Sequence, residues 1–186
     1  MTIEKLNEAI SYAAKMHATK KRKGTNIPYI VHPMETAAIA SSMTEDMEII
    51  AAAVLHDTVE DSDTTKEDLE RMFGKRVADL VASDSEDKME NIPSEKSWQI
   101  RKQATLDALK NSEYDEQIIV LADKLSNMRS LYKDYRVIGD KVWERFHVKE
   151  KEKHAWYYGG IKDALDKVKD TAAYEEYSAL IAKVFG

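Results

Sequence analysis

A chain of 186 residues that is 43% hydrophobic and 33% charged can build a sizeable core, and we expect residues 1–186 to form a single domain. It has no cysteine, which excludes disulfides, thiolate nucleophiles and cysteine-based zinc sites. A net charge of −6 argues against general nucleic-acid binding. Without a long apolar run or a signal-peptide pattern, we expect a cytoplasmic protein with no membrane partner.

The apolar residues recur with helical spacing almost throughout, which predicts an all-α helical bundle. Thr2 can cap a first helix that runs to about Thr19. A loop over 24–31 leads to a second helix with Pro33 in its first turn. The third helix, capped by Asp46, is apolar nearly all round and should be buried.

The next elements are marked by capping and breaking residues. Thr64 and Glu67 form a capping-box pattern that predicts a short helix ended by Gly74, and a further helix should run to about Val81. The polar segment 82–97 is predicted to be an exposed loop. Later helices are predicted over 98–110, 114–135, 141–166 and 171–185.

The segment 51–61 is an apolar helix that ends in one imidazole and three carboxylates. His56 and Asp57 are adjacent where the helix ends, and Glu60 and Asp61 return one turn later on the same face. Charged groups at the edge of a core need a partner or a cation. The cluster therefore predicts a metal site.

Two more residues can complete such a site. His32 stands between a loop and a helix start with a proline nearby on each side, and Asp123 directly follows an apolar run on a helix. Each alone also has an ordinary explanation: a histidine packed on its prolines, or an aspartate in a salt bridge. Together with the cluster after the third helix, they indicate metal ligands.

The basic segment 19–24 is the densest positive cluster in the chain. It can be a solvated helix end that complements the helix dipole, or a local patch for a small anionic substrate. The aromatic residues between 143 and 158 are expected to be core, although 156–158 could line a base pocket. The sequence leaves a homo-oligomer possible.

The order His32, His56-Asp57, Asp123 resembles the signature of the HD-domain phosphohydrolases. A closer resemblance is to the hydrolase domain of RelA/SpoT-type alarmone enzymes and to stand-alone small alarmone hydrolases. It covers about residues 3–135, ahead of C-terminal helices expected over about 141–185. The strings that carry it are RKG (22–24), PYIVHP (28–33), AVLHDTVED (53–61), FG (73–74) and LADKLSNMR (121–129).

This resemblance implies an HD-type fold that binds one divalent ion, usually manganese, and hydrolyses the 3′-pyrophosphate of guanosine tetra- or pentaphosphate. Two imidazoles and two carboxylates are also compatible with iron, zinc or cobalt. We interpret Glu60 as the principal general base or water-positioning group and Asp61 as its assistant, with roles that could exchange. The implied metal ligands are His32, His56, Asp57 and Asp123.

The family pattern also suggests how the substrate is bound. Arg22 would stack on a purine base, and Lys23 would meet phosphate. Asn127, one turn after Asp123, would face the same cavity and bond the nucleoside, unless it bonds only the local backbone. Arg129 would meet phosphate or pair with a carboxylate.

Two departures from the family pattern concern substrate recognition. The acidic segment 82–88 replaces a Gly-Val-Thr-Lys-like stretch, and the basic loop 22–28 has different spacing. Two alternatives therefore stay open: an HD phosphohydrolase acting on another nucleotide or phosphorylated metabolite, and a non-catalytic nucleotide sensor. The carboxylates of Glu60 and Asp61 speak against the sensor. No alarmone synthetase module is predicted.

Overall fold

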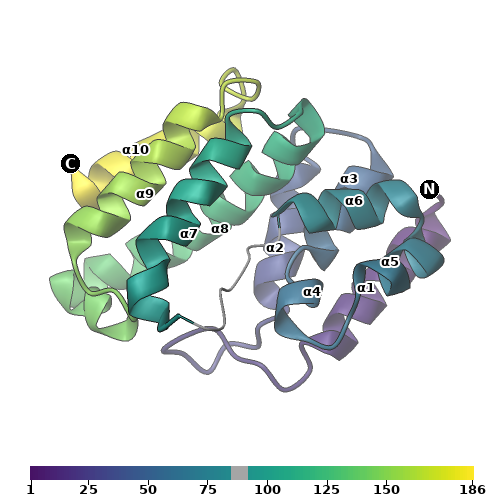
Figure 1. The fold of residues 1–186 in the computed structure, drawn as a ribbon, viewed down its shortest axis with the longest axis horizontal. Coiled ribbons are helices and arrows are strands. Elements are labelled where there is room, and N and C mark those ends of the chain that lie inside the picture. The colour runs from purple at the N-terminus through teal and green to yellow at the C-terminus, as the bar shows by residue number, and fades with distance from the viewer. Residues whose placement is uncertain (85–91) are drawn as a thin grey trace.

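The computed structural model describes residues 1–84 and 92–186, and these residues form helices and no strand (Figure 1). The prediction of an all-α fold is confirmed. None of the helices in the described ranges has the length and apolar character needed to cross a membrane. The two termini lie at opposite ends of the molecule.

The helices form two groups along the chain (Figure 1). The first group is α1 (Ile3–Met16), α2 (Val31–Ala40), α3 (Met47–Leu55), α4 (Thr58–Asp61), α5 (Lys66–Phe73) and α6 (Lys75–Asp84). The second is α7 (Ser94–Leu109), α8 (Tyr114–Ile138), the 3₁₀ helix η1 (Gly139–Arg145), α9 (Lys151–Ala164) and α10 (Ala172–Phe185).

Helix α8 joins the two groups, because it packs against α2, α3 and α6 as well as against η1 and α10. Its middle is apolar and buried, with Leu121, Leu125 and Met128 at most 1% exposed. A capping box fixes its start, and Gly139, with a positive φ of 57°, follows its end. Asp123 therefore lies in the buried middle of the longest helix, only 4% exposed.

Helix α3 delivers the other charged residues to the core. Asp46 caps it as predicted, accepting a hydrogen bond from the Glu48 amide at 2.9 Å. The helix packs against α1, α2, α6 and α8, so every residue from Ala51 to Leu55 is buried. Burying a side chain such as Leu55 contributes about 1.5–3 kcal/mol. That packing fixes the backbone from which His56 emerges.

The predicted capping box of α5 is wrong by one residue. The box is formed by Thr65 and Asp68, whose side chains each accept a hydrogen bond from the other's backbone amide at 3.1 Å. The Thr64 hydroxyl instead lies 2.9 Å from the Tyr12 hydroxyl, inside the fold. Two adjacent threonines each precede an acidic residue by three positions, and tertiary packing selects the second.

The predicted loop over 82–97 is also wrong at both ends. Helix α6 continues to Asp84, and α7 begins at Ser94. The segment 85–91 lies outside the described residues. The apolar spacing of α6 continues through Val77 and Val81 toward Asp84, so the helix reaches one turn further than its last apolar residue.

The single helix predicted over 141–166 is wrong, because η1 ends at Arg145 and α9 starts at Lys151. Residues 146–150 contain neither glycine nor proline, so the sequence carries no local signal for the break. The break is held by tertiary contacts. The His154 ring Nε2–H donates to the Val148 carbonyl at 2.8 Å, and the Trp143 ring stacks on the His154 ring.

Candidate metal centre

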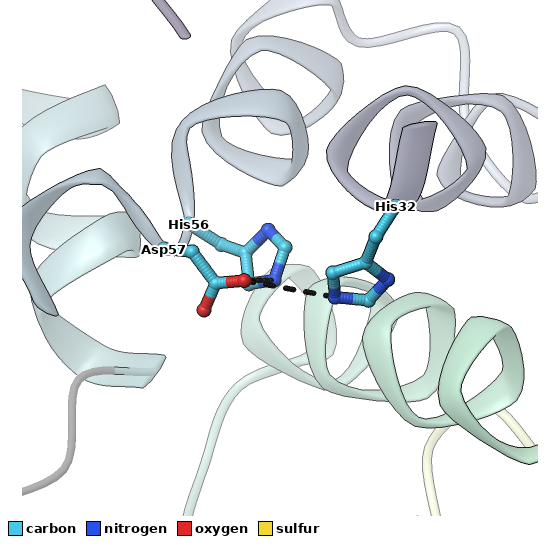
Figure 2. A group of neighbouring side chains, drawn as sticks. All are labelled: His32, His56 and Asp57. Carbon is cyan, nitrogen blue, oxygen red and sulfur yellow. Dashed lines mark ion pairs between the residues drawn. The ribbon is translucent and has the colours of Figure 1, made fainter. Parts of the chain in front are cut away.

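The four predicted metal ligands converge from three parts of the fold. His32 lies in the first turn of α2, His56 and Asp57 lie between α3 and α4, and Asp123 lies in α8. His32 Nε2 is 3.1 Å from Asp123 Oδ1 and 3.6 Å from Asp57 Oδ2. His56 Nε2 is 3.0 Å from Asp57 Oδ2 and 3.7 Å from Asp123 Oδ1. Figure 2 shows three of these side chains turned toward one another.

A backbone carbonyl fixes the ring orientation of His56. Its Nδ1 lies 2.9 Å from the Ala53 carbonyl oxygen, which can only accept, so Nδ1 carries the hydrogen. Nε2 then presents a lone pair. This nitrogen is buried and has no hydrogen-bond partner among the described residues. A buried polar atom left in this way is costly unless a cation meets it.

A hydrogen-bonded chain does the same for His32. The Ser126 hydroxyl donates to Glu35 Oε2 at 2.8 Å, so its oxygen accepts from His32 Nδ1–H at 2.8 Å. His32 Nε2 therefore also presents a lone pair to the two aspartates. Partners of this kind fix the orientation of metal-binding histidines and raise their basicity.

Two imidazole lone pairs and two carboxylate oxygens facing one another repel, and a divalent cation between them removes the repulsion. Ligands about 2.1 Å from a common ion lie roughly 3 to 3.5 Å apart, close to the four separations found here. The donor set therefore fits a divalent metal.

The charges of the centre also shift the pKa values of its residues. Burial alone would lower the pKa of His56, but Asp57 and Asp123 raise it well above its ordinary value. Burial would raise the pKa of Asp123, but Lys124 and the two histidines hold it well below the usual range. The centre thus favours a bound positive charge and ionised carboxylates.

Neighbouring groups hold the two carboxylates in place. The Tyr29 hydroxyl donates to Asp57 Oδ2 at 2.6 Å. The Asn127 amide donates to Asp123 Oδ1 at 2.6 Å, and Lys124 Nζ donates to Asp123 Oδ2. These contacts fix the carboxylate orientation and leave the carboxylates facing the histidines.

The centre opens into a polar cavity of about 160 Å³. This volume is below the roughly 300–1,000 Å³ of pockets that enclose a whole small ligand. It suits a phosphoryl or pyrophosphoryl group, with the rest of a larger molecule outside. The lining residues are Tyr29, His32, Asp57, Glu60, Asp84, Lys102, Thr105, Asp123, Lys124, Asn127 and Tyr157.

The two predicted catalytic carboxylates lie in different surroundings. Glu60 lines the cavity beside Asp57. Asp61 Oδ1 lies 3.2 Å from Lys20 Nζ, and its Oδ2 lies 3.9 Å from Nδ1 of the buried His17. Glu60 therefore faces the cavity, while Asp61 is engaged with His17 and Lys20, which follow α1.

The basic loop reaches the rim of the cavity. Arg22 Nη2 donates to Asn127 Oδ1 at 2.8 Å, and its guanidinium lies 5.5 Å from the centre of the Tyr29 ring. Lys23 Nζ lies 5.4 Å from the centre of the Phe146 ring. Asn127 thus bridges Arg22 to Asp123, which links the loop to the metal centre through two hydrogen bonds.

Arg129 lies elsewhere. Its guanidinium makes two hydrogen bonds to Glu176, at 2.7 and 2.6 Å, and one to Glu35 at 3.1 Å. It lines a different cavity, between α2, α8 and α10. Of the two roles expected for Arg129, carboxylate pairing is the one that the structure shows.

The sequence reasoning missed several residues of the cavity. Asp84, at the end of α6, places a carboxylate near His56 and Asp123, and burial raises its pKa to about 6. The sequence did contain an indication of this, because Asp84 lies three residues after Val81 and seven after Val77, on the buried face of α6. Lys102, from α7, lies 4.8 Å from the centre of the Tyr157 ring, and only tertiary packing brings these two to the site.

Comparison with known proteins identifies the family. An HD domain model matches residues 9–146. A zebrafish guanosine-3′,5′-bis(diphosphate) 3′-pyrophosphohydrolase MESH1 is 39% identical over 129 residues, which are 68% of each chain, and the human protein of that name is 37% identical. A GTP pyrophosphokinase rsh of Brucella ovis is 36% identical over 126 residues, but the match spans only 17% of its length.

Solved structures agree with this. One, described as a metazoan ortholog of SpoT that hydrolyzes ppGpp, superposes with a TM-score of 0.75 at 26% identity and covers 98% of this chain and 97% of its own. The structure of lmo0812 from Listeria monocytogenes superposes with a TM-score of 0.73 at 30% identity, and the match covers 83% of this chain and 98% of lmo0812. The resemblance seen in the motifs is confirmed: the chain belongs to the HD domain family.

Proposed function

We propose that the protein is a divalent-metal-dependent hydrolase that removes the 3′-pyrophosphate from guanosine 3′,5′-bis(diphosphate), releasing GDP and pyrophosphate, or GTP from the pentaphosphate. The observation that carries the proposal is the meeting of two histidine lone pairs and two carboxylates beneath a cavity of phosphoryl size. The relatives named for this reaction support the choice of substrate.

The metal would be held by the two histidines, Asp57 and Asp123. When bound, a divalent ion activates water for attack and withdraws charge from a phosphoryl oxygen. We propose manganese as the ion, and the nitrogen and oxygen donors are also compatible with iron, zinc or cobalt. Without a cation, the carboxylates lining the cavity would repel a polyanionic substrate.

The protein's own groups position the reactants. Glu60 orients the attacking water and accepts its proton as the bond to phosphorus forms, while Asp61, at the end of α4 and paired with Lys20, assists from outside the cavity. The bond from phosphorus to the ribose 3′ oxygen breaks, and that oxygen takes up a proton. Lys102 and Lys124 offset the charge of the departing pyrophosphate.

The nucleoside would lie at the rim, because the cavity is too small for the whole nucleotide. Arg22 offers a planar guanidinium for stacking on the base, and Lys23 offers an ammonium for phosphate. Asn127 can bond the nucleoside while it keeps Arg22 in place. We assign Arg129 no substrate contact, since Glu35 and Glu176 already bind its guanidinium.

A second candidate substrate is another nucleotide or phosphorylated metabolite. Asp84 favours it if the cation does not neutralise this carboxylate, because an additional negative charge in the cavity repels a highly charged pyrophosphate. A nucleotide sensor without turnover is the third candidate, and the presence of Glu60 in the cavity argues against it.

The proposal is tested by loading metal-stripped protein with manganese and incubating it with guanosine tetraphosphate beside a panel of nucleotides and phosphorylated metabolites. Ion-exchange chromatography should detect GDP and pyrophosphate. The Asp123→Ala variant should lose metal binding and turnover together. Turnover of another panel member supports the second candidate, and binding of guanosine tetraphosphate without turnover supports the sensor.

We further propose that the protein acts in the cytoplasm on a small nucleotide, with no nucleic-acid or membrane partner. Assembly of identical chains stays a prediction, which light scattering of the purified protein would test.

A further inference from the structure

A third carboxylate lies beside the metal centre and is not among its four predicted ligands. Asp84 ends α6, a helix that packs against α3 and α8, which lead to His56 and carry Asp123. One oxygen of Asp84, His56 Nε2 and an oxygen of Asp123 all lie within 4.8 Å of one another. The fold thus brings Asp84 to the same donor atoms that face the cation.

The donor chemistry of His56 limits what this carboxylate can do. His56 Nδ1 is occupied by the Ala53 carbonyl, so only Nε2 can bind an ion, and one ring lone pair binds one ion. Nε2 is buried, with the side chain 1% exposed, and has no hydrogen-bond partner among the described residues. An ion bound by His56 is therefore the same ion for both sets of neighbours, His32 with Asp57 and Asp84 with Asp123.

We infer that Asp84 is a fifth protein ligand of the divalent ion, an inference that rests on the metal centre proposed above. The charges balance with it in place: the three carboxylates of Asp57, Asp84 and Asp123 are neutralised by one divalent cation and the Lys124 ammonium. A buried cluster without this balance would be costly.

A fifth ligand has consequences for the choice of metal. Zinc is satisfied by four protein ligands in tetrahedral sites, which the two histidines and two aspartates already supply. Manganese accepts more oxygen donors, and carboxylates suit it well. Asp84 should therefore strengthen manganese binding more than zinc binding.

The test compares metal-stripped wild type with Asp84→Asn, which keeps the side-chain shape and removes the charge. Free manganese is followed by electron paramagnetic resonance during titration, and zinc binding is measured by competition with a chelating dye. The dissociation constant for manganese should rise at least about tenfold, as for losses of weaker outer contacts, and that for zinc should rise less. Asp79→Asn, an exposed carboxylate on the same helix, is the matched control.

Each other outcome is decisive. Unchanged manganese affinity in folded Asp84→Asn overturns the inference and leaves the four-ligand centre standing. Equal losses for both ions indicate a general charge effect and also overturn it. Failure of the wild type to bind either ion overturns the centre and the inference together. Circular dichroism checks folding, and Asp84→Ala replaces the asparagine variant if that variant unfolds.

Discussion

The chemistry of the centre depends on which nitrogen of each imidazole carries the hydrogen. Ala53 decides this for His56 through a backbone carbonyl, and Ser126 decides it for His32 through a hydroxyl that itself donates to Glu35. The first acceptor is a backbone carbonyl, so replacing a side chain does not remove it. The second can be removed by changing one side chain.

Ser126→Ala should therefore weaken metal binding about 10 to 100-fold, because the His32 ring loses the acceptor that fixes its orientation. Calorimetric titration with manganese measures the change, and circular dichroism checks that the buried site still folds. Ser130→Ala, on the same helix, is the control. An unaltered affinity would show that packing alone holds the ring.

Glu60→Gln should keep metal affinity but lose about 10²- to 10⁴-fold in kcat, because the amide cannot accept the proton of the attacking water. Asp61→Asn should lose less, since Asp61 is directed to Lys20 in the segment after α1. Steady-state kinetics and manganese titration of both variants separate the two roles. A fully active Glu60→Gln enzyme would contradict the assignment.

The sequence was sufficient to single out His56, Asp57 and Asp123, because these polar side chains follow apolar runs that must be buried, and His32, because it stands at a helix start between two prolines in a motif that resembles the family signature. It could not place Arg129, whose partner Glu176 comes from α10, far along the chain. Which side of α8 faces the cavity depends on how the other helices pack around it.

At the scale of elements, helix starts with a side-chain cap were the most predictable feature. Thr2 and Asp46 cap α1 and α3 as expected from local sequence, and Thr171, predicted as the first residue of the last helix, is the cap of α10. The errors occurred where two local solutions compete, as at Thr64 and Thr65, or where tertiary contacts break a helix without a local signal. Local propensity cannot decide between alternatives that differ only in their distant contacts.

The capping box of α5 gives a direct test. Thr65→Ala should lower the free energy of unfolding by about 1 kcal/mol, because the cap of an exposed helix start is lost while the metal centre is untouched. Glu67→Ala, which removes the partner expected from the alternative register, should change it little. Urea unfolding measures both, and equal losses would favour the register that the structure rejects.

At the scale of the molecule, two histidines outside the centre are buried. Burial lowers the pKa of both His17 and His154 below the ordinary value. The unfolded chain therefore binds protons more tightly at these positions than the folded chain does. Their contribution to stability is complete above the unfolded pKa of about 6.5 and is lost as the pH falls below it.

His154→Gln should reduce the acid sensitivity of the fold, because glutamine can still donate to the Val148 carbonyl but does not titrate. Urea unfolding at a series of pH values from 7.5 to 5 should give a shallower decline than in wild type, by at most about 1.4 kcal/mol per pH unit. The exposed His147→Gln is the matched control. Parallel curves for wild type and His154→Gln would contradict this.

The placement of Asp123 on α8 also bears on how the protein is made. During synthesis the N-terminal helices leave the ribosome first. His32, His56 and Asp57 therefore emerge well before α8, which carries Asp123. A nascent chain that stops short of α8 lacks both the carboxylate and the Ser126 hydroxyl that orients His32. If the proposed centre binds its ion, we expect capture to follow the synthesis of α8, because a product that stops before α8 lacks the Asp123 carboxylate.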